Sequence, residues 1–311
     1  MARPTILVVG ATGNTGKSAV HSLPKLLESN SKTYRILGLT RTLDSAASKQ
    51  LAALPHVEML EKDWTTIDAD WLKSQNVVRA YVAPHNLPHQ FVDESALYVA
   101  MLHAGVEYVV KVSTNVEYIG PTNPVFYGRS HWAIENLLSQ PEFEGLQWTS
   151  LQPNIFTVSY LASAVDWIKA YQTTGKQDLF ALIPDSDVAV AMIDPEDVGD
   201  VGAHLMALED PTPHNHAKYV LSGPEDVTGK RVVELVEQYA GTKVQEAEFK
   251  SMSWLHDLVK QGLYSGTVLP SIMAGCEPVW QGKCSLAEMP TSKEILDLAP
   301  PKRTASDTMR A

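Results

Sequence analysis

The stretch TILVVGATGNTG, residues 5–16, decides the fold. Its first five residues are a short run rich in β-branched side chains, which predicts a buried strand. Three glycines follow directly, and residues 17–27 then carry apolar side chains at helical spacing. A strand, a glycine-rich turn and a helix in this order predict a Rossmann unit, in which the turn and the helix N-terminus bind the pyrophosphate of a dinucleotide.

Each glycine has a separate purpose in such a turn. Gly10 permits the sharp change of direction, Gly13 lets the backbone approach a pyrophosphate, and Gly16 lets the helix pack close to the sheet. The alternative is a tight turn without a ligand. The residues that we expect to bind a cofactor here are Gly10, Thr12, Gly13, Asn14, Thr15 and Gly16.

Strands and helices alternate along the first half of the chain, which predicts an α/β fold with a doubly wound parallel sheet. Further strands are expected at 35–39, 57–60, 77–82, 108–112 and 148–151, and helices at 92–103 and 127–138. Pro24 should kink or shorten the first helix.

The pattern loosens after Pro153. We expect helices at 158–173, 197–208 and 231–239, irregular strands over 179–193, a strand at 218–222, a helical segment over 253–280 and a frayed end over the last dozen residues. This organisation predicts an NAD(P)-binding Rossmann domain at 1–153, to which 190–222 return, and a smaller C-terminal α+β substrate-binding domain at 154–311.

Composition excludes several classes of protein. The chain has 311 residues, of which 44% are apolar and 20% charged, and its net charge of −11 argues against nucleic-acid and anionic-membrane partners. No signal peptide, membrane span or Gly-x-Ser-x-Gly elbow is visible in the sequence. Cys276 and Cys284 are expected to be free thiols of a reducing compartment, so we expect a soluble, cytoplasmic protein with a small-molecule substrate.

The second strand is followed by Arg41, where an acidic residue would select NAD. A cation at this position suits the 2′-phosphate of NADP(H), and the alternative is a solvated surface arginine. Asp63 and Trp64, after the third strand, stand where an adenine ring would lie. For Asp63 the alternative is the N-cap of a helix at 67–72.

An ordered set of motifs resembles the NmrA-like family, a group of atypical short-chain dehydrogenases/reductases. The resemblance covers roughly residues 4–250. It rests on the glycine turn, Thr40-Arg41, Lys62-Asp63 and the segments WTSLQPN at 148–154, IDPEDVG at 193–199 and YVLSGPE at 219–225. Gln152 departs from the arginine that such proteins often carry before the proline. The resemblance implies a Rossmann domain with NADP(H) as cofactor.

The resemblance to short-chain reductases also implies an active site. There the fifth strand ends in Ser or Thr, and the next helix carries Tyr-x-x-x-Lys. Here the strand is followed by Ser113 and Thr114, and the helix has Tyr127 and, in place of the lysine, His131. Positions i and i+4 share a helix face, so both side chains can point at a nicotinamide. The alternative is that both are core residues; Glu135 is expected to be structural.

Tyr127 and His131 lead to two expectations for proton transfer. Either Tyr127 donates the proton while His131 orients it, or His131 is itself the general acid, which its ordinary pKa of about 6.5 would suit. Ser113 or Thr114 would hydrogen-bond the substrate oxygen.

Other candidate residues line the expected pocket. Ala83, Pro84 and His85, after the fourth strand, should pass near the nicotinamide. The prolines flanking His85 and His89 argue against a helical metal-binding pair, and no metal site is expected. Substrate-binding residues are expected at Asn154, Phe156 and Tyr160, and the segment 254–280 is expected to close the pocket. For these aromatic residues the alternative is plain core packing.

Two classes of function follow from the resemblance. The first is an NADPH-dependent reductase of a carbonyl, enone or quinone-like hydrophobic or aromatic molecule. The second is an NADP(H)-sensing regulatory protein that binds a protein partner without catalysis. A non-redox isomerase or dehydratase on the same fold is a third alternative.

Overall fold

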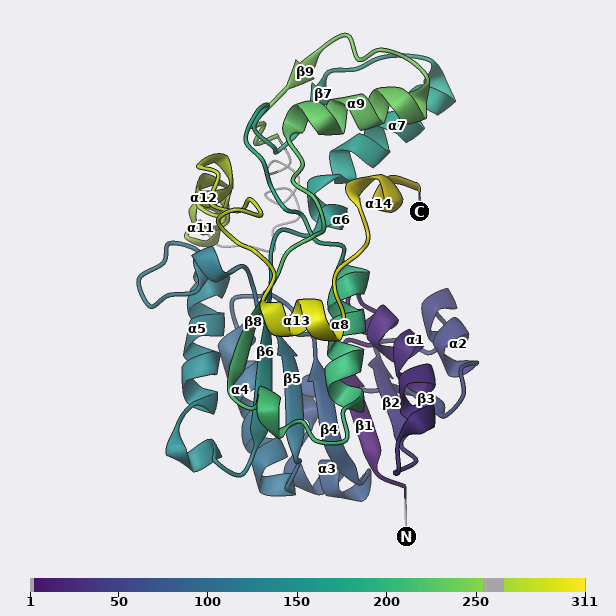
Figure 1. Ribbon diagram of the computed structural model, residues 1–311, viewed down its shortest axis with the longest axis vertical. Coiled ribbons are helices and arrows are strands. Elements are labelled where there is room, and N and C mark those ends of the chain that lie inside the picture. Colours follow the sequence, from purple (N-terminus) through teal and green to yellow (C-terminus); the bar gives the residue numbers. More distant parts are fainter. Residues whose placement is uncertain (1–2, 254, 256–265, 311) are drawn as a thin grey trace.

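A seven-stranded parallel sheet forms the body of the protein in the computed structural model, which describes residues 3–253, 255 and 266–310 (Figure 1). Its strands are β1 (Thr5–Val9), β2 (Arg35–Thr40), β3 (Val57–Glu61), β4 (Val77–Val82), β5 (Tyr108–Val112), β6 (Gln147–Pro153) and β8 (Ala217–Leu221). The order across the sheet is β3-β2-β1-β4-β5-β6-β8, and every pairing is parallel. The predicted doubly wound sheet is therefore confirmed.

Helices cover both faces of the sheet because its strands are apolar on both sides. In β1, Ile6 and Val8 join one apolar cluster, while Leu7 and Val9 join the other. The first cluster packs under α1 (Gly16–Leu26), α2 (Ala46–Ala52) and α8 (Pro195–Ala207). The second packs under α3 (Ala69–Ser74), α4 (Gln90–Ala104) and α5 (Phe126–Leu138).

Helices α1 and α8 are in close contact although they are far apart in sequence. The hydroxyl of Ser18 donates to the carbonyl of Glu196 over 2.8 Å, and that of Ser22 donates to Asp200 over 2.6 Å. A Cβ on Gly199 would lie 2.0 Å from the carbonyl oxygen of Thr15, so the glycine allows this close approach. The first helix of the chain is thus completed by a much later one.

Local expectations differ from the structure at a few points. The strands expected for the parallel sheet all form within about two residues of the predicted bounds, while α2 was not predicted. The irregular strands expected over 179–193 are reduced to a two-residue strand at Phe180–Ala181. Helix α1 is not shortened at Pro24: it continues to Leu26 and tightens into a 3₁₀ turn, η1 (Leu27–Ser29). Further 3₁₀ turns are η2 (Trp64–Thr66), η3 (Val116–Tyr118), η4 (Pro141–Phe143) and η5 (Thr212–His214).

A smaller unit stands beyond the carboxyl ends of the strands (Figure 1). It contains α6 (Thr157–Tyr160), α7 (Ala162–Thr174), α9 (Gly229–Ala240), and the short parallel pair β7 (Phe180–Ala181) and β9 (Ala247–Glu248). These elements share a third apolar cluster. Helices α11 (Val268–Met273) and α12 (Cys276–Trp280) lie near the start of α5.

The C-terminal segment is ordered against the body of the protein, so the expectation of a frayed end was wrong. Helix α13 (Lys293–Leu298) contacts α8, and α14 (Ala305–Arg310) contacts α6. Arg303 forms ion pairs with Asp197 and Asp200 of α8. These charge-assisted contacts fix the segment, and its basic composition gave no hint of them.

Both cysteines are free, as expected, and both are buried. Burial raises the pKa of each thiol to about 11. Among the described helices, none combines the length and the apolar character needed to cross a membrane.

Candidate functional site

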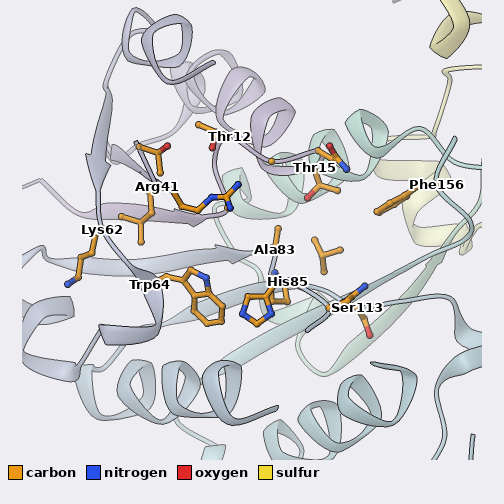
Figure 2. A pocket seen from close by; sticks show the side chains of 17 residues that line it. Thr12, Thr15, Arg41, Lys62, Trp64, Ala83, His85, Ser113 and Phe156 are labelled. Atoms are coloured by element: carbon orange, nitrogen blue, oxygen red, sulfur yellow. The ribbon is translucent and has the colours of Figure 1, made fainter. Parts of the chain in front are cut away.

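A pocket of about 430 Å³ opens where the carboxyl ends of the central strands meet (Figure 2). In an open parallel sheet this edge is where ligands bind, because the strand order reverses there. The lining residues come from the ends of six strands and the loops that follow them, and are Gly10, Thr12, Gly13, Asn14, Thr15, Leu39, Thr40, Arg41, Lys62, Trp64, Ala83, Pro84, His85, Asn86, Val112, Ser113 and Phe156.

The glycine turn forms one wall of the pocket, and its geometry explains two of the glycines. Gly10 has a φ of 79°, and a Cβ there would lie 2.7 Å from the carbonyl oxygen of Ala83. A Cβ on Gly16 would lie 2.1 Å from the carbonyl oxygen of Gly10. The turn therefore holds the start of α1 against the sheet, and the N-cap of this helix, Thr15, lines the pocket.

Cationic and aromatic side chains form one end of the pocket. Arg41 is exposed and, within the described residues, makes no ion pair. Figure 2 shows it reaching from the end of β2 toward the glycine turn. Lys62 lies 5.1 Å from the ring of Trp71. The rings of Trp64 and His85 are 5.5 Å apart, so a flat group has an aromatic wall at this end.

The other end of the pocket is formed by Phe156 and Ser113. The hydroxyl of Ser113 donates to Oε1 of Glu135 over 2.8 Å. Burial acts to raise the pKa of Glu135, but Lys111, the donated hydroxyl hydrogens and Lys218 outweigh it, and the pKa lies below its ordinary value. Glu135 is therefore an ionised acceptor, and the proton of Ser113 is directed away from the pocket.

His131 is buried behind this end of the pocket rather than on its surface. Nζ of Lys111 lies 3.0 Å from Nδ1 of His131, and Oδ1 of Asn86 lies 3.2 Å from its Nε2. An ammonium group can only donate, so Nδ1 accepts and the ring proton is on Nε2. Nε2 lies between Oδ1 of the pocket residue Asn86 and the side-chain amide of Gln90, which is 3.1 Å away.

Burial and the charge of Lys111 hold the pKa of His131 well below 6.5. The ring is therefore neutral at pH 7 and below. The expectation that its pKa near neutrality would suit a general acid was wrong, because the sequence could not show the burial or the neighbouring lysine.

Lys111 is a residue that the sequence prediction missed. Its side chain is fully buried, with Nζ 3.4 Å from Oε1 of Glu94. Glu94 also accepts from the hydroxyl of Tyr98 over 2.7 Å and from Gln90 over 3.0 Å. The sequence did hold a signal: a lysine in the middle of a strand expected to be buried on both faces must be paired.

The structure brings most of the predicted cofactor-binding residues to this pocket. All of them line it except Gly16, which lies behind the turn, and Asp63. The carboxylate of Asp63 accepts from the N–H of Thr65 over 3.0 Å and so caps η2, not the predicted helix at 67–72. Asp68 caps α3 instead.

Of the predicted catalytic residues, Ser113 alone is among the described lining residues, and Thr114, Tyr127 and His131 are not. Tyr127 lies against Tyr118, with its ring 5.8 Å away and edge-on, and a Cβ on Gly275 would come within 3.4 Å of its hydroxyl oxygen. Burial raises the pKa of Tyr127 above its ordinary value. Tyr127 and His131 therefore face different surroundings.

Of the predicted substrate-binding residues, Phe156 lines the pocket. Asn154 is buried, donates to Ser222 over 3.0 Å and accepts from Asn115 over 3.0 Å, so its amide is already engaged. Tyr160 is 6% exposed and belongs to the apolar cluster of the smaller unit. The expected closing segment begins at Trp254 and lies partly outside the described residues.

The sheet, the glycine turn and the pocket at the strand ends define a Rossmann protein of the dinucleotide-binding type. The profile of the NmrA-like family matches residues 2–270, and the chain belongs to this family. Among curated proteins it is similar to the NAD(P)H azoreductase of Xenophilus azovorans, with 29% identity over 240 residues, 77% of this chain and 75% of that protein.

Solved structures share the fold at lower identity. The NADPH-dependent quinone oxidoreductase QOR2 of Escherichia coli, complexed with NADPH, matches with a TM-score of 0.71 and 18% identity over 98% of both chains. NmrA, a negative transcriptional regulator in complex with NADP, matches with a TM-score of 0.65 and 15% identity, over 100% of this chain and 91% of that chain. Proteins named as a reductase and as a regulator thus share this architecture.

Proposed function

We propose that the protein is an NADPH-dependent reductase of flat, conjugated acceptors such as quinones and related carbonyl compounds. The observation that carries the proposal is the pocket itself. One end of the pocket is cationic and aromatic and is formed by Arg41, Lys62 and Trp64. The glycine turn lines the middle, and Ser113 and Phe156 form the other end. The names of the azoreductase and of QOR2 agree with reduction of such molecules.

The lining residues fit NADPH part by part. The glycine turn would hold the pyrophosphate, because Gly13 lines the pocket and has no side chain between its backbone and the ligand. Arg41 is exposed at the pocket and would bind the 2′-phosphate, while Trp64 would stack beside the adenine. Bound NADPH would supply a hydride at the other end of the pocket.

The groups near Ser113 that could donate a proton to the reduced substrate indicate which type of acceptor the protein can reduce. Glu135 is ionised, the imidazole of His131 is neutral and buried, and the Ser113 hydroxyl is donated to Glu135. A reduced quinone leaves a phenolate-type oxygen, whose pKa near 10 resembles that of tyrosine, and water can protonate it. A simple ketone leaves a far more basic alkoxide that needs a protein acid. The surroundings therefore favour conjugated acceptors.

The experiment measures NADPH oxidation with a 1,4-quinone, an azo dye and a simple aliphatic ketone. In the quinone reaction, NADPH, one proton and the quinone give NADP⁺ and the hydroquinone. We expect turnover with the quinone and little with the ketone, and turnover of the azo dye would show that a proton donor reaches the acceptor. Tight NADPH binding without oxidation by any acceptor would contradict the proposal.

The regulatory alternative has one observation in its favour. Ser113 is the sole predicted catalytic residue among the described lining residues, and Tyr127 lies toward Gly275. A protein that only senses NADP(H) would show this cofactor pocket without an exposed acid, and NmrA itself shares the fold. The same assay separates the two, because a sensor binds NADPH and leaves it unoxidised.

A further inference from the structure

Two histidines and an aspartate converge beside the cofactor pocket. His89 is the N-cap of α4, Asp93 lies one turn into the helix, and His85 comes from the loop after β4. Nε2 of His85 is 3.3 Å from Oδ2 of Asp93, and Nε2 of His89 is 3.4 Å from the same oxygen. The flanking prolines do not prevent this arrangement, because the helix starts just after Pro88.

The Asp93 oxygen at the centre of this group lacks a hydrogen bond. Oδ2 is buried, and no donor among the described residues is aligned with it, although two ring nitrogens are close. A buried carboxylate oxygen without a partner is costly and requires an explanation. A hydrogen bond from a protonated imidazole would be shorter, about 2.7–2.9 Å, and aligned with the oxygen.

A shared metal ion explains both the distances and the missing alignment. Zinc binds histidine nitrogen and carboxylate oxygen at about 2.0–2.2 Å, and neighbouring ligands of a tetrahedron are then about 3.3–3.4 Å apart. In such a site each lone pair would point to the ion at the common centre rather than to another ligand. Each of the three side chains offers one ligand atom, and these atoms all lie within 4.8 Å of one another.

We propose that His85, His89 and Asp93 bind a divalent transition-metal ion of the zinc type. Its ligands are the two Nε2 atoms and Oδ2, and water completes the coordination, since the His89 side chain is 60% exposed. Imidazole and carboxylate ligands together suit Zn²⁺ or Co²⁺ better than Mg²⁺ or Ca²⁺, which prefer oxygen.

One contact limits the affinity. The N–H of Leu87 lies 3.3 Å from Nδ1 of His85, which acts as the acceptor. Metal binding at Nε2 requires the proton on Nδ1, so this long hydrogen bond is given up when the ion binds. We therefore expect micromolar rather than tighter binding.

The test uses full-length protein without a histidine tag and needs no turnover of NADPH. Co²⁺ is added while the visible d–d absorption is recorded, and Zn²⁺ binding is measured by calorimetry. We expect one ion per chain, with the intense visible band of four-coordinate Co²⁺. His89→Ala and Asp93→Asn should each weaken binding by at least about 10–100-fold, the loss that follows when merely a hydrogen-bond partner of a metal ligand is removed.

His103→Ala is the matched control, because His103 is exposed on the same helix. It should bind both ions like the parent protein. Circular dichroism of each variant without metal tests whether the fold is kept. The result for His89→Ala is decisive, because His89 is the most exposed of the three ligands and its replacement disturbs the fold least. No saturable binding of either ion, or equal binding by the parent, His89→Ala and Asp93→Asn, would overturn the proposal.

Discussion

The cofactor pocket and the buried cluster of Lys111, Glu94 and His131 behind it both carry cationic side chains. The cations of the two regions are in opposite situations. Arg41 and Lys62 line the pocket, and Arg41 is exposed to solvent. Lys111 is fully buried, with Glu94 3.4 Å away and His131 3.0 Å away. One region keeps its charges available for a ligand, and the other satisfies its charges internally.

This difference separates ligand binding from stability. Removing a pocket cation should weaken a ligand and leave the fold unchanged, because the side chain is already hydrated. Removing a buried cation should cost stability, because the charges around it lose their partner in the protein interior. The variants described next test whether this difference between the two regions holds.

Lys111→Met should have the largest effect, on stability. Loss of the ammonium leaves the buried carboxylate of Glu94 without its cation, at a cost of about 3–5 kcal/mol in the free energy of unfolding. Urea denaturation measures it. Lys62→Met is the matched control and should stay within about 0.5 kcal/mol of the parent protein. Equal losses in the two variants would remove the contrast.

Gly13→Val should abolish most NADPH binding while the protein stays folded. A Cβ at this position would lie 3.1 Å from the carbonyl oxygen of Gly10, which a small shift accommodates, but the branched side chain occupies the place of the pyrophosphate. We expect a loss of at least about 100-fold, or about 2.7 kcal/mol, by calorimetry. Gly120→Val, away from the pocket, should bind normally. Normal binding by Gly13→Val would place the phosphates elsewhere.

Arg41→Ala should distinguish the two cofactors. Loss of a charge-assisted contact to the 2′-phosphate costs about 1.5–3 kcal/mol, which corresponds to about 10–150-fold in the dissociation constant of NADPH. The dissociation constant of NADH should barely change, because NADH has no phosphate there. Calorimetry with both cofactors measures this, and a parallel weakening of the two would show that Arg41 does not read the phosphate.

The smallest effect concerns pH. His131 has its pKa lowered well below 6.5 in the folded state, so below about pH 6.5 the unfolded chain binds a proton that the folded protein does not. Stability due to this group therefore falls as the pH falls, by up to about 1.4 kcal/mol per pH unit. The pKa values of His204 and His214 are lowered too, so the parent must be compared with His131→Gln.

Urea denaturation at pH 7 and near pH 5.5 gives this comparison. His131→Gln should lose less stability than the parent between the two values. An NMR titration of the His131 ring gives an independent check, and a pKa at or above 6.5 would contradict the assignment.

The sequence predicted the fold and one wall of the site because their signals are local. The glycine turn follows a strand and precedes a helix within residues 5–16, and Arg41 directly follows β2. Such signals depend on a few neighbouring residues, and the structure places them as expected. The strand bounds were predictable for the same reason: buried parallel strands are continuous apolar runs.

The surroundings of His131, Glu135 and Tyr127 could not be predicted from the sequence, because each of these side chains contacts residues from other elements. The tautomer of His131 is set by Lys111 on β5, and the protonation of Glu135 depends on the hydroxyls of Ser113, just after β5, and Ser150 on β6. The surroundings of Tyr127 are set by Gly275, which lies far along the chain. Helix periodicity showed that Tyr127 and His131 share a face, but not what each would meet there.

The contact between α1 and α8 has a consequence for how the protein forms during synthesis. The partners Ser18 and Glu196 are separated by 178 residues. At about 5–20 residues per second, a ribosome needs on the order of 10–40 s to make the chain between them. During that interval the first helix packs on β1 and β2 but lacks α8, and the sheet lacks β8. We therefore expect the nascent first half of the chain to engage chaperones, and to reach its native packing only after α8 has emerged.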